Sequence, residues 1–258
     1  MKEKILALAR NPEDRLLLAN VWDKIGADYL VHTRFLDLRE RALVQQAARI
    51  AKQRHIFWGG YPDAERVCAI FLPDYLSEED AVTEENSPVV LLRAEKKPAD
   101  QLSHRDYLGG LMGLQISRDT IGDILVGAHG AELLVLREMA DFILLHFAQA
   151  GRKTIHVSPF PLSKLRLPVV QEIEKEGSVA SLRLDSLAAL IFSLPRSEVQ
   201  AMIAKGLVFV NQQPCLKPGH TLSPGDRMTV RGKGRAAIIA LGGTSRKGRQ
   251  FVRYTRTQ

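Results

Sequence analysis

Residues 182–211, LRLDSLAALIFSLPRSEVQAMIAKGLVFVN, decide the fold of the C-terminal third of the chain. Residues 183–192 are apolar and predict a short helix, which is interrupted at Pro195. A second helix is expected over 196–204, because a proline at the start of a helix lacks only an N–H that would have no partner there. Ser197 is a candidate to help cap this second helix. The stretch therefore predicts two helices in quick succession.

A small sheet is expected after the two helices. Gly206 suits the left-handed residue that ends a helix, and residues 207–210 are apolar enough for a strand. Residues 211–214, Asn-Gln-Gln-Pro, form a turn sequence, and 228–230 predict a closing strand. Two helices packed on a small sheet are the implied C-terminal unit, which we place at residues 181–258.

The positive charge of the chain is concentrated at its C-terminal end. Residues 227–258 contain nine lysines and arginines and no aspartate or glutamate, so they carry +9, whereas the whole chain carries +7. The rest of the chain therefore sums to −2. A basic tail of this kind is either simply solvated or a contact for a polyanion, because clustered positive charge attracts phosphate.

The middle of the chain, residues 88–165, has the element order of a ferredoxin-like domain. Apolar runs predict strands over 88–96, 121–126, 131–136 and 153–157, and helices over 103–114 and 137–149. The resulting order is βαββαβ, the split βαβ pattern.

RNA-recognition modules share this topology, but they stack bases on aromatic residues in two strands of the sheet. Residues 121–126 and 131–136 contain no aromatic residue. Topology alone therefore does not predict a sheet that reads RNA. Backbone contacts to RNA from Lys96, Lys97, His104 and Arg105 stay open beside a purely structural role.

Residues 1–76 predict an N-terminal α/β unit. Apolar residues recur at helical spacing over 6–25 and 36–50, and 67–72 predict a strand. Residues 57–62, Phe-Trp-Gly-Gly-Tyr-Pro, form a turn-rich aromatic stretch. Two polar segments without apolar periodicity, 77–87 and 174–178, are predicted as linkers between the three units.

The composition excludes several classes of protein. Cys68 and Cys215 lie far apart and have no CxxC partner, so we expect reduced thiols and no zinc or other metal. No run of about 18 apolar residues predicts a transmembrane helix, and the first 15 residues are too charged for a signal peptide. We therefore expect a cytoplasmic protein without a membrane partner.

Basic and polar side chains of the C-terminal unit are candidates to bind RNA, since such groups near helix starts hold phosphate together with free backbone N–H groups. The candidates are Arg183, Arg196, Ser197, Gln200, Lys205, Asn211, Arg231, Lys233, Arg235, Arg246, Lys247 and Arg249. Structural alternatives stay open: Arg183 could form a local pair with Asp185, and Lys205 could be an ordinary cation at a helix end. We expect Asp185 to orient a partner rather than to touch RNA.

Several short motifs follow one another in a fixed order in this unit. They are LRLD at 182–185, RS at 196–197, IAKG at 203–206, VFVN at 208–211 and GD at 225–226. In this order they resemble the S4 RNA-binding domain, which is named after a protein of the small ribosomal subunit. The chain departs from that pattern at Pro195, where a polar residue is frequent, and at Gln212, which replaces the usual glycine. We expect altered turn geometry at both positions.

Motifs in the rest of the chain resemble the YlmH family. They are FLD at 35–37, GGY at 59–61, AER at 64–66, HRDYLGGLMGLQISR at 104–118 and IGDI at 121–124. The resemblance spans nearly the whole chain and implies binding to ribosomal RNA or tRNA. The family is implicated in handling obstructed large ribosomal subunits that still carry peptidyl-tRNA, so a role in translation quality control is implied as well. No cofactor or small-molecule substrate is expected.

Three motifs point weakly toward catalysis. RLD at 183–185 resembles the catalytic motif of pseudouridine synthases, but here it opens the S4-like unit itself. HRD at 104–106 lacks the residues that follow it in kinases, and GGTSRKG at 242–248 lacks the order of a phosphate-binding loop.

The sequence thus predicts an α+β protein of three units that binds RNA without catalysis. The alternative is an RNA-modifying enzyme of the pseudouridine-synthase kind, which would use the S4-like unit for delivery. Asp106 and Asp123 are the candidate carboxylates for that alternative.

Overall fold

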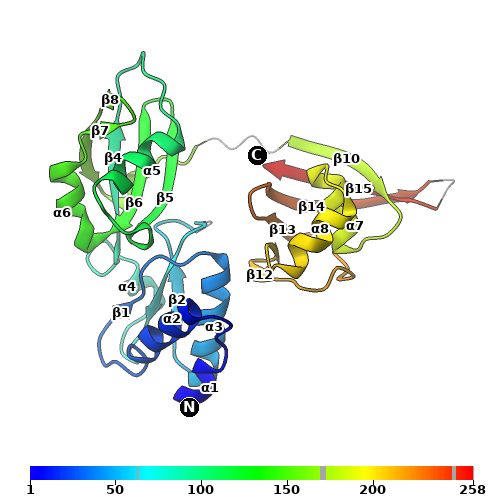
Figure 1. Cartoon of the computed structure of the whole chain (residues 1–258), viewed down its shortest axis with the longest axis horizontal. Helices are drawn as coiled ribbons and strands as arrows, with labels where there is room; N and C mark the ends of the chain where they lie inside the picture. The colour runs from blue at the N-terminus through cyan, green and yellow to red at the C-terminus, as the bar shows by residue number, and fades with distance from the viewer. Residues whose placement is uncertain (63, 169–172, 246–247, 258) are drawn as a thin grey trace. The chain divides into compact units, whose positions relative to one another are not determined.

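The computed structural model describes residues 1–62, 64–168, 173–245 and 248–257. The chain divides into two compact units, residues 1–168 and 169–258 (Figure 1). Each unit combines helices with antiparallel sheet, which confirms the α+β class. The finer division at 1–76, 88–165 and 181–258 stays a prediction.

The first unit begins with helices around a small sheet. Its elements are α1 (Lys2–Leu6), α2 (Pro12–Trp22), β1 (Val31–His32), α3 (Leu38–Ala51), β2 (His55–Trp58), β3 (Cys68–Phe71) and α4 (Glu78–Ala81). The strands pair antiparallel in the order β1-β3-β2. The prediction of a turn at 57–62 was therefore wrong for Phe57 and Trp58, which end β2. Phe57 packs on the core of this part, and Arg41 lies over its ring at 4.8 Å.

A four-stranded sheet with two helices completes the first unit. Its main elements are β4 (Val89–Glu95), α5 (His104–Gly113), β5 (Ile121–Gly127), β6 (Gly130–Leu136), α6 (Arg137–His146) and β9 (His156–Phe160). The strand order is β5-β6-β4-β9, with every neighbouring pair antiparallel. The helix predicted over 137–149 ends earlier, because Gln149 and Ala150 form β7, which pairs with β8 (Lys153–Thr154).

Both faces of this sheet are buried. Leu92, Ala94 and Leu133 face α5 and α6, where Tyr107 and Leu111 pack against them.

The opposite face carries Leu91 and Leu134, which pack against Phe35 and Cys68 from the preceding part of the chain. Arg93 and Glu132 form an ion pair of 2.6 Å that is also buried.

The second unit is a six-stranded sheet with two helices. Its elements are β10 (Ile173–Val179), α7 (Leu184–Phe192), α8 (Arg196–Ala204), β11 (Val208–Val210), β12 (Gln213–Pro214), β13 (Arg227–Val230), β14 (Gly234–Thr244) and β15 (Gln250–Thr257). The order is β10-β15-β14-β13-β11-β12. Residues of α7 and α8 share one buried core with Val230, Ile238 and Val252 of the sheet. The two helices therefore cover one sheet face (Figure 1).

Two predictions about this unit were wrong. The charged segment 174–178 is not a linker, because it lies within β10 and pairs with β15 along its whole length. The basic residues from 227 on do not form a tail either: Arg227, Arg235, Arg253 and Arg256 lie on β13, β14 and β15. The candidates Arg246 and Lys247 lie outside the described residues.

The chain departs from the S4 pattern at Pro195, before α8, and at Gln212, in the turn between β11 and β12. Pro195 is the N-cap of α8 and no side chain caps this helix, so the capping role expected of Ser197 was wrong. Asn211 and Gln212 both have positive φ, 49° and 65°, between the paired residues Val210 and Gln213. This is a two-residue hairpin turn with both central residues left-handed.

Candidate nucleic-acid interface

A buried carboxylate organises the start of both helices in the second unit. Asp185, in the first turn of α7, is fully buried. Its Oδ2 accepts hydrogen bonds from Arg196 Nε at 3.0 Å and Gln200 Nε2 at 2.9 Å, and its Oδ1 accepts one from Arg183 Nε at 3.3 Å. Three of the predicted RNA contacts are thus gathered around one anion. The structural alternative for Arg183, a pair with Asp185, is thus present with a buried carboxylate, and Asp185 orients its three partners as expected.

The charge balance of this cluster keeps the carboxylate ionised. Burial acts to raise the pKa of Asp185, but hydrogen bonds from Gln200, Arg196 and Arg183 outweigh it and hold the pKa below its ordinary value. The side chains of Arg183 and Arg196 are 46% and 52% exposed. Each guanidinium is therefore fixed on its inner side and open to solvent on its outer side. We name Arg183, Asp185, Arg196 and Gln200 the Asp185 cluster.

Further candidates lie along α8. Ser197 is exposed in its first turn, and Lys205 is exposed at its C-cap. The hydroxyl of Ser197 and the ammonium of Lys205 lie at opposite ends of the helix, so only Ser197 is close in sequence to the Asp185 cluster.

The candidates on the turn and strands already have partners within the unit. Asn211 donates from Nδ2 to Asp226 Oδ1 at 2.8 Å and accepts from the backbone N–H of Arg227 at 2.9 Å. Lys233 lies 3.3 Å from Glu198, and Arg249 donates from Nε to Ser178 Oγ at 3.0 Å. These side chains hold the turn and the strands together whatever else they bind.

The remaining candidates, Arg231 and Arg235, follow β13 and begin β14. Among the described candidates, the contacts around Asp185 hold Arg183 and Arg196, which lie at the starts of α7 and α8.

The sheet face used by RNA-recognition modules is closed in the first unit. Phe35 and Cys68 lie against it, and the segment after β9 covers its edge, with Phe160 under the guanidinium of Arg93 at 3.9 Å. Arg93 also donates to the Lys164 carbonyl at 2.8 Å. Bases cannot stack on a face that protein already occupies, which gives a structural reason for the missing aromatic residues.

The two carboxylates considered for catalysis have structural partners. Asp106 accepts from the backbone N–H of Ser103 at 2.8 Å and completes a capping box at the start of α5. Asp123 accepts from Tyr61 Oη at 2.7 Å and from the backbone N–H groups of Glu65 and Arg66. These bonds anchor Tyr61, Glu65 and Arg66 to β5.

Sequence reasoning missed the outer residues of β15. Phe251 and Arg253 are exposed, whereas Val252 and Tyr254 between and after them are buried. The signal that favours a strand is the composition of 251–254, in which Phe251, Val252 and Tyr254 are aromatic or β-branched. It was hidden by the reading of this stretch as a charged tail.

Metal and membrane features are few in the described part of the chain. No group of three or more His, Cys, Asp or Glu side chains there could hold a metal ion. No single described helix is long and apolar enough to cross a membrane; α7 and α8, bent by 119°, pass that test only as a pair. Their apolar residues are largely buried in the core of the second unit.

Comparisons with known proteins agree with the motifs. Residues 92–164 match a family model described as a putative RNA-binding domain in YlmH, and residues 182–228 match the S4 domain model. The ribosome-associated protein quality control protein P2 of Bacillus subtilis is 32% identical over 227 residues, which cover 87% of this chain and 86% of that protein.

A solved structure is also similar. The cell division protein YlmH from Streptococcus pneumoniae is 21% identical, covers 61% of this chain and 98% of its own, and has a TM-score of 0.49. The sequence relationship over almost the full length of both proteins is the stronger finding. With both domain models in the expected order, the chain belongs to the YlmH family.

Proposed function

We propose that this protein is a non-catalytic, cytoplasmic factor that binds ribosomal RNA or tRNA on the large ribosomal subunit through the Asp185 cluster. The observation that carries the proposal is the buried Asp185, which holds Arg183, Arg196 and Gln200 at the exposed starts of two helices. The name of the Bacillus relative, a ribosome-associated quality control protein, supports a ribosomal partner.

The binding mode follows from the chemistry of the cluster. Guanidinium groups that are already fixed on one side lose less conformational freedom when they bind phosphate. Phosphate contacts position a protein on RNA, whereas RNA shape supplies the specificity. Ser197 and Lys205 at the two ends of α8, together with Asn211, Arg231, Lys233, Arg235, Arg246, Lys247 and Arg249, are secondary candidates.

The first unit has a supporting role in this proposal. Its antiparallel order β5-β6-β4-β9 supports the ferredoxin-like class for residues 88–165. Because this sheet face is closed, RNA would contact the loops and helix ends of the first unit. Lys97, His104 and Arg105 are exposed there. A phosphate contact there would add affinity without reading bases.

Crosslinking of the intact protein to RNA in cells, with sequencing of the captured RNA, tests the proposal. We expect large-subunit ribosomal RNA and tRNA, crosslinked to peptides of the second unit. Arg196→Glu should reduce this capture, whereas Arg15→Glu, the same change on an exposed site of α2, should leave it unchanged. Capture of unrelated messenger RNA, or equal capture by both variants, would contradict the proposal.

A further inference from the structure

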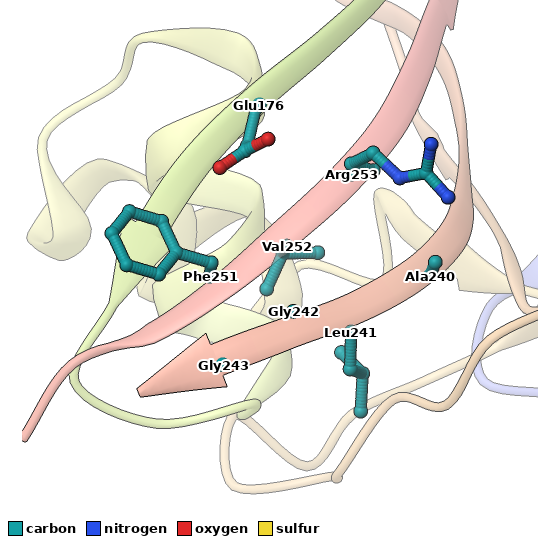
Figure 2. Close-up of a pocket in the computed structure, with 8 residues that line it drawn as sticks. All are labelled: Glu176, Ala240, Leu241, Gly242, Gly243, Phe251, Val252 and Arg253. Atoms are coloured by element: carbon teal, nitrogen blue, oxygen red, sulfur yellow. The ribbon is translucent and has the colours of Figure 1, made fainter. Parts of the chain in front are cut away.

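The sheet of the second unit has an outer face, opposite the side where α7 and α8 pack. Side chains alternate along a strand, so Phe251 and Arg253 point outward while Val252 and Tyr254 are buried beneath them. Figure 2 shows Phe251 and Arg253 projecting from β15, with Glu176 on the neighbouring β10. These residues lie outside the ranges that either domain model matches.

A shallow hollow of about 230 Å³ lies on this face (Figure 2). Its lining includes Phe251, Arg253 and Glu176, together with Ala240, Gly242 and Gly243 of β14. Sites for drug-sized molecules enclose roughly 300–1,000 Å³, so this hollow suits a single flat group. A side chain on Gly242 would meet Cβ of Phe251 at 3.0 Å. The glycine therefore keeps the approach to the phenyl ring open.

The charges around the hollow are unevenly distributed. Directly paired residues of antiparallel strands share a face, so Arg227, Ala237 and Thr255 form one outward row. Arg235 is paired with Thr229 in the next row. Positive charge thus lies on β13 and β14, and Arg253 on β15, which lines the hollow beside Phe251, is a further cation on the same face.

The acidic residues beside the hollow, Glu174 and Glu176, lie on the edge strand β10. Glu176 is paired with Arg253 in the sheet register, and Glu174 lies 3.5 Å from the guanidinium of Arg253. A chain of phosphates is therefore repelled from β10 and attracted toward β13 and β14. A carboxylate beside an exposed ring can instead accept a hydrogen bond from the edge of a base.

We propose that the outer face binds one unpaired nucleotide of RNA, whose base stacks on Phe251. Its amino group donates to Glu176, and its neighbouring phosphates lie toward Arg227 and Arg235. The inference rests on the proposed function, because it takes RNA as the partner, but it uses the sheet face away from α7 and α8. Cytosine, adenine and guanine carry an exocyclic amino group, whereas uracil offers only its ring N3–H between two carbonyl oxygens that a carboxylate repels, so uracil binds more weakly at this site.

Fluorescence anisotropy of the full-length protein with labelled oligo(C) and oligo(U) tests this site. Removal of an aromatic stacking platform weakens binding of a base by about 5- to 30-fold, and we expect this loss for Phe251→Ala with oligo(C). Phe251→Trp should retain affinity. Phe142→Ala is the control, because Phe142 on α6 of the first unit is 41% exposed and Phe251 is 36% exposed. This control should leave the affinity for oligo(C) unchanged. Glu176→Gln should remove the preference for oligo(C) over oligo(U).

A second measurement does not depend on the folding of any variant. Ultraviolet crosslinking of oligo(C) to the wild-type protein, followed by trypsin, should place the adduct on the peptide of residues 250–253. Adducts only on peptides of α7 and α8, or wild-type affinity in Phe251→Ala, would overturn the inference.

The two proposals fail separately. If Phe251→Ala leaves the affinity for oligo(C) unchanged while Arg196→Glu weakens binding to large ribosomal subunits, only the outer-face site is wrong. If the wild-type protein binds neither oligo(C) nor large subunits, the proposed function is wrong as well.

Discussion

Arg196 donates from Nε to Oδ2 of Asp185 at 3.0 Å, and its Nη2 lies 2.9 Å from the same oxygen in an ion pair. The acceptor is fully buried, whereas about half of the arginine side chain is exposed. Charge-assisted hydrogen bonds of this kind are stronger than neutral ones. The pair therefore ties the start of α8 to the start of α7 and presents the outer edge of the guanidinium to solvent. Stability and RNA binding should depend on the same carboxylate.

Replacement of Asp185 by Asn should destabilise the second unit by about 2–3 kcal/mol, because three hydrogen bonds to a buried carboxylate lose the negative charge of their acceptor. Both tryptophans, Trp22 and Trp58, lie in the first unit. In urea unfolding, the midpoint of the transition followed by circular dichroism should therefore fall to a lower urea concentration. The midpoint followed by tryptophan fluorescence should stay unchanged. Glu198→Gln breaks only the half-exposed pair with Lys233 and should cost at most about 1 kcal/mol. Equal shifts in the two variants would contradict the account.

The contribution of Asp185 should also depend on pH in a defined direction. Its pKa in the folded protein lies below the ordinary value of 3.8, so the folded state favours the ionised form. The stabilisation is therefore fully present above 3.8 and is lost as the pH falls through the folded pKa. The difference in unfolding free energy between wild type and Asp185→Asn should narrow in acid. A difference that stays constant from neutral pH into this range would show that the charge is not involved.

Replacement of Gln212 by Gly should stabilise the protein. Gln212 has a φ of 65°, in the left-handed region that disfavours side chains. Glycine relieves this cost, although it adds freedom to the unfolded chain, so we expect a net gain of about 0.5–1 kcal/mol. Gln213→Gly, one residue later in β12, should instead be destabilising. Urea unfolding by circular dichroism measures both, and a loss of stability in Gln212→Gly would contradict the turn assignment.

Gly122 is expected to be intolerant of a side chain. A Cβ at this position would lie 2.7 Å from the ring of Phe35 and 3.0 Å from the Leu134 carbonyl oxygen. Phe35 is buried on the closed face of the sheet, so Gly122→Ala should cost about 1–3 kcal/mol. Gly109→Ala, in the middle of α5 with open space around it, should stabilise by about 0.5–1 kcal/mol. Urea unfolding followed by tryptophan fluorescence measures the stability of both variants. An unchanged unfolding free energy in Gly122→Ala would show that the sheet face is not closed as described.

The affinity for RNA should fall with salt. If about five basic side chains touch phosphate, the plot of log affinity against log salt concentration should have a slope of roughly −3.5 to −4.5. Titration of the protein with large-subunit ribosomal RNA at increasing potassium chloride concentration measures this slope. A slope near zero would contradict an electrostatic contact.

The sequence predicted those parts of the fold whose signals are local. The helices 184–192 and 196–204 follow from apolar spacing and from Pro195, and the hairpin of β5 and β6 follows from its apolar runs and glycines. All of these form within short stretches of the chain.

The missed parts depend on distant partners. β10 is rich in charge and both its faces are largely exposed, so it has no apolar pattern; it forms because β15, about 80 residues later in the sequence, pairs with it. The closed face of the middle sheet depends on Phe35 and Cys68, which precede it in the chain. The motif around Asp185 named Arg183, Arg196 and Gln200 as candidates, but only the structure shows that one carboxylate holds all three.

The most direct test of the central claim is the affinity of the double variant Arg196→Glu/Lys205→Glu for purified large ribosomal subunits. Each reversal places a negative charge at one end of α8, at a residue proposed to hold phosphate, and both residues are exposed. We predict a loss of affinity of tenfold or more, an order-of-magnitude expectation for removed phosphate contacts, with an unchanged circular dichroism spectrum. Affinity equal to that of wild type in this folded variant would place the RNA-binding surface elsewhere.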